Sequence, residues 1–246
     1  MTIPHKLKRY VKDFDFSYCY GVYPTLELID FQPGNILAVL LHSKGTTNKG
    51  IIKIRQACSN YQIEVIENDN LVEKLADRGN TYAIGVFNKY SSQLSHQHNH
   101  LVLVNPSSMG NLGTILRAML GFGYSNLAII EPGADHYDPK VIRASMGAIF
   151  QINIKRYQSF PDYWGSYGDH HLYTLMTNGK ISLPEIAFQS PHGLVFGSEA
   201  GGLPDEYLDF GTSIKIPYDN QVDSINLALS VGITMFHSYV SDTDNN

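Results

Sequence analysis

Short apolar runs alternate with stretches of helical pattern along this chain, and no other feature of the sequence constrains the fold as strongly. In the second part of the chain, five apolar runs have the length of buried strands: 101–104, 127–130, 172–176, 193–196 and 213–216. Helical patterns lie between them, notably 112–120 and 225–239. Strands that alternate with helices predict an α/β fold with a mainly parallel sheet. Ligands of such sheets bind beyond the carboxyl ends of the strands, so the loops there are the places to search for chemistry.

A polar stretch over residues 91–100 divides the chain. Before it, a strand at 36–41, helical patterns at 49–60 and 70–78 and a strand at 82–87 predict a smaller α/β module. We therefore expect a first domain at 1–93, a linker at 94–100 and a second domain at 101–246. The linker contains three alternating histidines, but no cysteine or carboxylate lies close by in sequence, which disfavours a metal site. These are His96, His98 and His100.

The formal net charge of −5 by itself argues against a nucleic-acid partner. That argument weakens when the charge is summed separately for the two parts of the chain. Residues 1–100 sum to +2 and residues 101–246 to −7. Four cations precede the first acid, Asp13, and they are either a solvated terminus or a short arm that meets phosphates. They are Lys6, Lys8, Arg9 and Lys12.

The remaining composition indicates a cytoplasmic protein. The chain has two cysteines without metal-type spacing, which fits a reducing compartment and excludes a disulfide scaffold. No apolar run approaches the ~18–20 residues that span a bilayer, and the first residues lack the apolar core of a secretory signal. We expect neither a membrane partner nor a metal.

Three loops after strands carry polar and glycine residues in patterns that suit a ligand site. In the first, Asn111 stands where we expect a helix N-cap, and Arg117 lies off the apolar face of that helix. The second runs from Phe196 to Pro204 and combines three glycines with the carboxylate of Glu199. The third runs from Ile216 to Asn226. Each loop alone is explained equally well by ordinary capping and turn formation.

Together, the three loops resemble the three signature motifs of the SpoU (TrmH) family of SPOUT RNA methyltransferases. The first motif is Asn111-Leu112-Gly113 with Arg117, the second is Phe196-Gly197 with Glu199 and Gly202-Leu203-Pro204, and the third is Ile216-Pro217 with Ser224 and Asn226. The segment Arg143–Ala148 is similar to one that these proteins carry between the first two motifs. Residues 20–90 look like the ribosomal-protein-like substrate-binding domain of many members, although that match is looser.

The resemblance implies an α/β SPOUT-type domain with a deep C-terminal trefoil knot, preceded by a small ribosomal-protein-like α/β domain that binds RNA. It implies a homodimer packed through the catalytic domains, and S-adenosylmethionine as the donor of a methyl group to a ribose 2′-hydroxyl of rRNA or tRNA, with rRNA slightly favoured. The implied catalytic residues are Asn111, Arg117, Glu199, Ser224 and Asn226. The implied cofactor-binding residues are Thr177, Gly197, Ile216, Pro217 and Ile225.

The role of Arg117 and two alternative functions stay open. The family's proposed base is this arginine, but a guanidinium pKa above ~12 makes deprotonation expensive, so it could instead bind a phosphate and the developing alkoxide. A non-catalytic RNA-binding member of the family is the main alternative function. A dinucleotide-dependent α/β enzyme is less well supported, because the glycine fingerprint of that class is absent.

Overall fold

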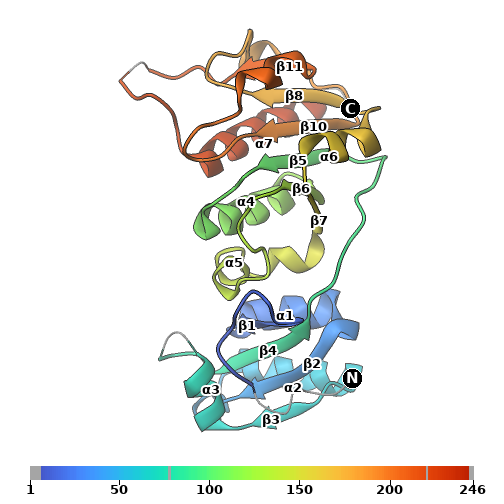
Figure 1. The fold of residues 1–246 in the computed structure, drawn as a ribbon. Coiled ribbons are helices and arrows are strands. Elements are labelled where there is room, and N and C mark those ends of the chain that lie inside the picture. Colours follow the sequence, from blue (N-terminus) through green and yellow to red (C-terminus); the bar gives the residue numbers. More distant parts are fainter. Residues whose placement is uncertain (1–6, 77–78, 220, 244–246) are drawn as a thin grey trace. The chain divides into compact units, whose positions relative to one another are not determined.

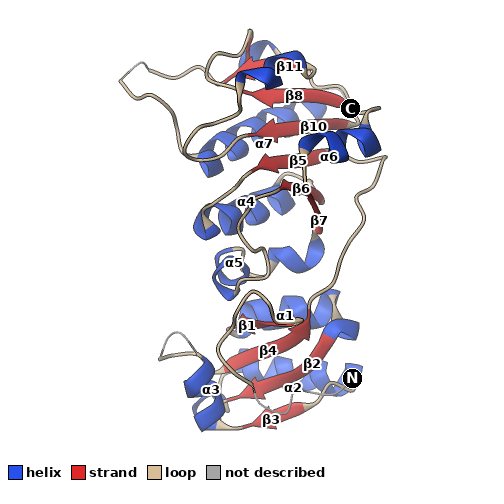
Figure 2. Cartoon of the chain, viewed as in Figure 1, coloured by secondary structure: helices blue, strands red, loops and turns tan. Residues whose placement is uncertain are grey.

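The computed structural model describes residues 7–76, 79–219 and 221–243. Lys6 of the predicted basic arm lies outside the described residues. By their internal contacts the residues group into two compact units, Met1–Tyr90 with Asp135–Gln151, and Ser91–Ala134 with Ile152–Asn246. Figures 1 and 2 show the helices and strands of both units. No helix within the described ranges has the length and hydropathy needed to cross a bilayer.

The first unit is built on a four-stranded sheet. Its elements are β1 (Phe16–Tyr20), α1 (Val22–Phe31), β2 (Ile36–Leu41), α2 (Lys49–Tyr61), β3 (Val65–Glu67), α3 (Asp69–Leu75) and β4 (Ala83–Asn88). The strand order is β1-β4-β2-β3, with β4 antiparallel to both of its neighbours and β2 parallel to β3. Side chains of β2 alternate between two faces: Leu40 packs with residues of α3, whereas Val39 and Leu41 pack with residues of α1 and α2. This burial on both faces explains the continuous apolar run, and the predicted strand 36–41 is confirmed.

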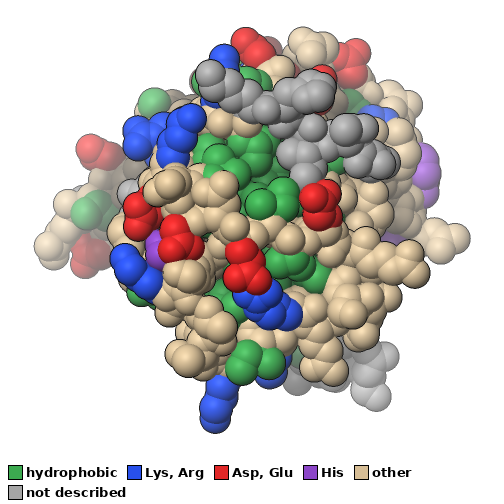
Figure 3. All heavy atoms as spheres, turned by 90° about the horizontal axis from the view of Figure 1, so that it is seen from below, with side chains coloured by type: hydrophobic (Ala, Val, Ile, Leu, Met, Phe, Trp, Pro, Cys, Tyr) green, Lys and Arg blue, Asp and Glu red, His purple; other side chains and the backbone are tan. Residues whose placement is uncertain are grey.

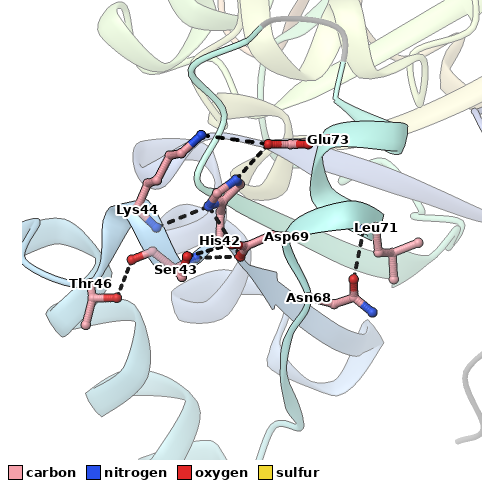
Figure 4. A network of polar contacts seen from close by, with 8 residues as sticks. All are labelled: His42, Ser43, Lys44, Thr46, Asn68, Asp69, Leu71 and Glu73. Carbon is pink, nitrogen blue, oxygen red and sulfur yellow. Dashed lines mark hydrogen bonds and ion pairs between the residues drawn. The ribbon is translucent and has the colours of Figure 1, made fainter.

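The loop after β2 is fixed to the start of α3 by polar contacts (Figure 4). Ser43 donates hydrogen bonds to Asp69 from its backbone N, at 2.8 Å, and from its Oγ, at 2.6 Å. The buried His42 ring lies between Asp69 and Glu73, with its Nε2 3.2 Å from Glu73 Oε1. Lys44 Nζ is 3.9 Å from the same Glu73 oxygen. The charges of this loop are therefore largely balanced within the unit.

Residues 135–151 pack with the first unit, although the predicted boundary at 94–100 assigned them to the second. They contain α5 (Pro139–Ala144) and a 3₁₀ turn, Ala148–Gln151. Ser17 Oγ donates to Tyr137 O at 2.6 Å, and the Phe150 ring meets the Phe87 ring edge-on at 5.3 Å. Arg143, the first residue of the family-like segment Arg143–Ala148, places its guanidinium over the Tyr20 ring at 5.4 Å. In the structure, aromatic side chains of this segment pack against Phe87 in the core of the first unit.

Phe150→Ala should lower the free energy of unfolding by about 3–5 kcal/mol, the usual cost of removing a buried phenylalanine ring. Only 1% of the Phe150 surface is exposed. Phe31→Ala is the matched control, because that side chain is 48% exposed, and it should cost less than about 1 kcal/mol. Chemical denaturation measures both. Equal losses for the two variants would show that residues 135–151 do not form part of this core.

The second unit is built on a seven-stranded parallel sheet. Its strands are β5 (His100–Val104), β6 (Asn126–Ile130), β7 (Asn153–Tyr157), β8 (His171–Leu175), β9 (Ile181–Ser182), β10 (His192–Phe196) and β11 (Thr212–Lys215). Its helices are α4 (Met109–Gly121), α6 (Phe160–Tyr167) and α7 (Leu227–Thr243). The strand order is β7-β6-β5-β10-β8-β11-β9, and every neighbouring pair is parallel. This confirms the α/β prediction, and β10 lies between two strands that precede it in sequence (Figure 1).

The predicted linker belongs to the second unit. Residues 91–99 form neither helix nor strand, but His100 already begins β5 and is fully buried. Leu94 packs in a core cluster with Val102 of β5 and Tyr163 of α6. The His100 ring is hydrogen-bonded to Tyr163 Oη at 3.0 Å and to Ser95 O at 2.9 Å. Within the described ranges, no group of three His, Cys, Asp or Glu side chains is placed to hold a metal ion.

Candidate active site

The three predicted motifs meet around one cavity beyond the carboxyl ends of β8, β10 and β11. Its volume is about 680 Å³, within the usual range for a cofactor-sized ligand. It lies where the chain order of the sheet reverses, since β10 enters between the earlier strands β5 and β8. Of the predicted residues, eight line it: Asn111, Thr177, Gly197, Glu199, Ile216, Ser224, Ile225 and Asn226.

Two predicted residues are not among the described residues that line the cavity. Pro217 stands between Ile216 and Tyr218, which both line it. Arg117 is exposed on α4, six residues beyond Asn111. In this chain, Arg117 therefore lies outside the described lining of the cavity.

The Glu199 carboxylate is held by groups of the first motif loop. Its Oε2 accepts hydrogen bonds from Ser107 N and Ser107 Oγ, both at 2.9 Å. Its Oε1 accepts from Ser108 N and from Asn111 Nδ2, both at 3.1 Å. A carboxylate offers about four acceptor positions, so these donors use nearly all of its capacity.

These contacts keep Glu199 ionised. Partial burial favours the neutral carboxyl, but the hydrogen bonds, led by that from Ser107 N, outweigh it and lower the pKa from 4.5 to about 2. Because the pKa is lower in the folded chain, the bonds contribute stability above pH 4.5, and this contribution is lost as the pH falls toward 2. A carboxylate with such a low pKa is a weak base near neutral pH, so the pKa disfavours Glu199 as the general base.

Asn111 and Asn226 continue this hydrogen-bonded chain. Asn226 Nδ2 donates to Asn111 Oδ1 at 3.2 Å. Asn226 Oδ1 accepts from the backbone N of Ala228 at 2.8 Å and of Leu229 at 3.4 Å, so Asn226 caps α7. The expected N-cap role of Asn111 is wrong: α4 begins at Met109, and Ser108 is its N-cap. Asn111 lies within the first helical turn, where its side chain is available to Glu199.

The second motif forms a tight turn around Gly197. Gly202 N donates to Ser198 O at 3.0 Å, and Gly202 has a φ of +66°. A Cβ on Gly197 would lie 1.9 Å from Gly202 C and 2.2 Å from Leu203 N. Only glycine fits at this position, so the backbone itself lines this part of the cavity.

Sequence reasoning missed Ser107, which lies outside the cavity lining, and four residues within it: Ser108, Asn178, Asp205 and Tyr218. Asn178 Nδ2 donates to Asp205 Oδ1 at 3.3 Å, and both residues line the cavity. Tyr218 Oη donates to Asp223 O at 2.8 Å and closes the loop before Ser224. The one available signal was the pair of serines after β5, because serine is a favoured N-cap; nothing local pointed to a carboxylate 91 residues away.

Residues 98–236 match the SpoU rRNA Methylase family, which is more than half of the chain. The chain belongs to this family. SpoU family membership accounts for the order of the three motifs around one cavity. It also confirms the resemblance that the sequence suggested.

Proteins similar in sequence to this chain include RNA methyltransferases. The chain is 33% identical over 146 residues to an uncharacterized tRNA/rRNA methyltransferase, slr1673, of Synechocystis, covering 58% of this chain and 53% of that protein. It is 29% identical over 143 residues to a tRNA (cytidine(34)-2′-O)-methyltransferase of Aeromonas hydrophila, covering 56% of this chain and 91% of that protein. The chain thus spans about half the length of the Synechocystis relative.

Solved SpoU structures share the fold. The AdoMet complex of the SpoU methyltransferase AviRb from Streptomyces viridochromogenes aligns with a TM-score of 0.81 over 94% of this chain and 92% of its own, at 19% identity. A structure described for 2-OH methylation of C/U34 on tRNA aligns with a TM-score of 0.57 over 61% of this chain and 99% of its own, at 29% identity. The first alignment extends over both units, whereas the second covers little more than half of the chain.

Proposed function

We propose that this chain is an S-adenosylmethionine-dependent methyltransferase that acts on a ribose 2′-hydroxyl of RNA. The observation that supports it most is the hydrogen-bonded chain through Glu199, Asn111 and Asn226, which joins the three SpoU motifs at one cavity. The relatives named as 2′-O-methyltransferases of tRNA and rRNA support the same reaction class.

The cavity suits S-adenosylmethionine. Gly197 contributes only backbone to the lining, and Thr177, Ile216 and Ile225 add a hydroxyl and apolar surface. When bound, the cofactor supplies a methyl group on a sulfonium, which is already a good leaving group. The protein then has to supply a positioned and partly deprotonated ribose hydroxyl.

Different residues orient the substrate and stabilise the charge that develops on its hydroxyl. Each side-chain amide has two N–H donors, and the described contacts use one on Asn111 and one on Asn226. The second donor of each can orient an oxygen of the substrate. We assign Arg117 to a phosphate near the target ribose and to the developing alkoxide, while the proton of the ribose hydroxyl passes to solvent water.

We favour rRNA over tRNA as the substrate. Structures of the AviRb methyltransferase and of an rRNA methyltransferase from Sinorhizobium meliloti align over more than 90% of this chain, including the first unit. The first unit is the proposed RNA-binding, ribosomal-protein-like domain. Its charges are dispersed: Figure 3 shows basic and acidic side chains interspersed on one face. Exposed Lys8, Lys49 and Lys53 are the cations we assign to phosphate contacts.

We also propose that the C-terminal segment forms a trefoil knot and that the protein is cytoplasmic. Two features support a knotted C-terminal segment. Strand β10 lies between β5 and β8, and the segment that follows the third motif ends in α7, which packs on α4. Both cysteines are buried and unpaired, which fits a reducing compartment.

A homodimer through the second unit is supported by an apolar stripe on α7. Four exposed residues lie on one face of this helix at spacings of four, three and four: Leu229, Ile233, Phe236 and Val240. Phe236→Asp should convert the dimer into monomers, because it places a charge in the proposed interface. Sedimentation equilibrium measures this. A wild-type chain that sediments as a monomer at micromolar concentration would refute the dimer.

Transfer of a radiolabelled methyl group from S-adenosylmethionine to purified rRNA and tRNA tests the reaction directly. We expect label in a 2′-O-methylnucleoside after digestion of rRNA. Calorimetry with S-adenosylmethionine and NAD tests the alternatives. Cofactor binding without transfer to either RNA would favour a non-catalytic member, and binding of NAD alone would favour a dinucleotide enzyme.

A further inference from the structure

Ser107 lies in the loop between β5 and α4, outside all three SpoU motifs. It is exposed, and it is not one of the described residues that line the cavity. Yet it donates two of the four hydrogen bonds that other residues direct at the Glu199 carboxylate, one from its backbone N and one from its Oγ. It is the only one of the three donor residues that contributes both a backbone and a side-chain group.

The orientation of Glu199 decides the orientation of the two amides beyond it. Since a carboxylate only accepts, Asn111 must turn its Nδ2 toward Glu199 Oε1, and its Oδ1 then faces Asn226 Nδ2. Asn226 must in turn direct its Oδ1 at the first backbone N–H groups of α7. The hydrogen-bonded chain therefore runs from the Glu199 carboxylate through Asn111 and Asn226 to the N-terminus of α7. If either side-chain amide were flipped, two hydrogen-bond donors or two acceptors would face each other.

We propose that Ser107 is a positioning residue for the methyl transfer: its hydroxyl fixes the Glu199 carboxylate, and through it the amide orientations of Asn111 and Asn226. This inference rests on the proposed function. Without the hydroxyl, Oε2 keeps only the backbone N–H of Ser107, and the carboxylate can rotate away from Asn111. The amide donors that face the substrate then lose their fixed direction.

Ser107→Ala removes the hydroxyl, Ser107→Thr retains it, and Ser166→Ala is the matched control. Ser166 is an exposed serine on α6, where its Oγ donates to Asp162 O at 3.3 Å, remote from the motif residues in sequence and outside the cavity lining. For Ser107→Ala we expect kcat to fall about tenfold, the effect of one lost hydrogen bond to a charged group. The Kd for S-adenosylmethionine should stay within about twofold, because Ser107 does not line the cavity.

A second measurement separates positioning from a general structural role. Carbon-13 NMR of the glutamate side chains follows the titration of Glu199, whose pKa is about 2 in the wild-type chain. In Ser107→Ala this pKa should rise, because the hydrogen bond from Ser107 Oγ to Glu199 Oε2 is gone. In Ser107→Thr both kcat and the pKa should return to the wild-type values, and in Ser166→Ala neither should change.

The outcomes are distinguishable. Wild-type kcat or an unchanged Glu199 pKa in Ser107→Ala overturns the inference, as does a threonine variant that restores neither. A parallel loss of kcat and of cofactor affinity in Ser107→Ala also overturns it, because the cavity itself would then have changed. If the wild-type chain transfers no methyl group to RNA, the proposed function fails before the variants are compared.

Discussion

Arg117→Ala should lower methyl transfer by at least about a hundredfold while leaving the Kd for S-adenosylmethionine within about twofold. The guanidinium is the one predicted catalytic cation, and it is the group we assign to the phosphate and the developing alkoxide. Arg117 is exposed on α4 and does not belong to the described lining of the cavity, so its loss should spare cofactor binding. Single-turnover transfer to RNA and calorimetry with the cofactor measure the two quantities.

Arg117→Lys separates charge from geometry. Lysine keeps the positive charge but lacks the planar fork that binds a phosphate in two places, so we expect only partial recovery of the rate. Full activity of the alanine variant would refute the assignment of Arg117. A matching loss of cofactor affinity would place this side chain in the cofactor site instead.

Gly197→Ala should abolish detectable binding of S-adenosylmethionine, and with it methyl transfer. The added Cβ would lie within about 2 Å of the backbone at Gly202 and Leu203, where neither a rotamer change nor a small shift relieves the clash. The turn would have to open, and the backbone wall of the cavity would open with it. Calorimetry measures the loss of affinity.

Gly201→Ala is the matched control in the same turn. A Cβ there would meet only Ser198 Oγ, at 3.8 Å, and Gly201 is not at a positive φ. Its affinity loss should be far smaller than that of Gly197→Ala. Equal affinity in the wild type and in Gly197→Ala would show that the cofactor does not bind in this cavity.

The buried strands and the place of the cavity could be predicted because both leave a local pattern in the sequence: apolar runs for the strands and polar, glycine-containing loops after them for the cavity. Residues 36–41 read as a buried strand because β2 is covered on both faces, and the polar loops after β5, β10 and β11 pointed to the sheet edge where the cavity lies. The motifs then brought Asn111, Glu199 and Asn226 together in expectation, and the structure joins them by hydrogen bonds.

The features that could not be predicted depend on contacts between residues that are far apart in the sequence. Residues 135–151 carry no local sign that Phe150 completes the core of the first unit, 63 residues away from Phe87. Ser107 looked like a turn residue, because its role depends on Glu199, which a sheet crossover brings beside it. The N-cap role expected of Asn111 was wrong, because Ser108 caps the helix and the Asn111 amide donates to the Glu199 carboxylate instead.

Mapping of 2′-O-methylated riboses on total RNA tests the central claim most directly. The comparison is between a strain that lacks this gene, its parent, and the deletion strain complemented with the wild-type or the Arg117→Ala chain. The account predicts one or more riboses, in rRNA before tRNA, that are methylated in the parent, unmethylated in the deletion strain and restored only by the wild-type chain. Identical methylation maps of rRNA and tRNA in the parent and the deletion strain would contradict it.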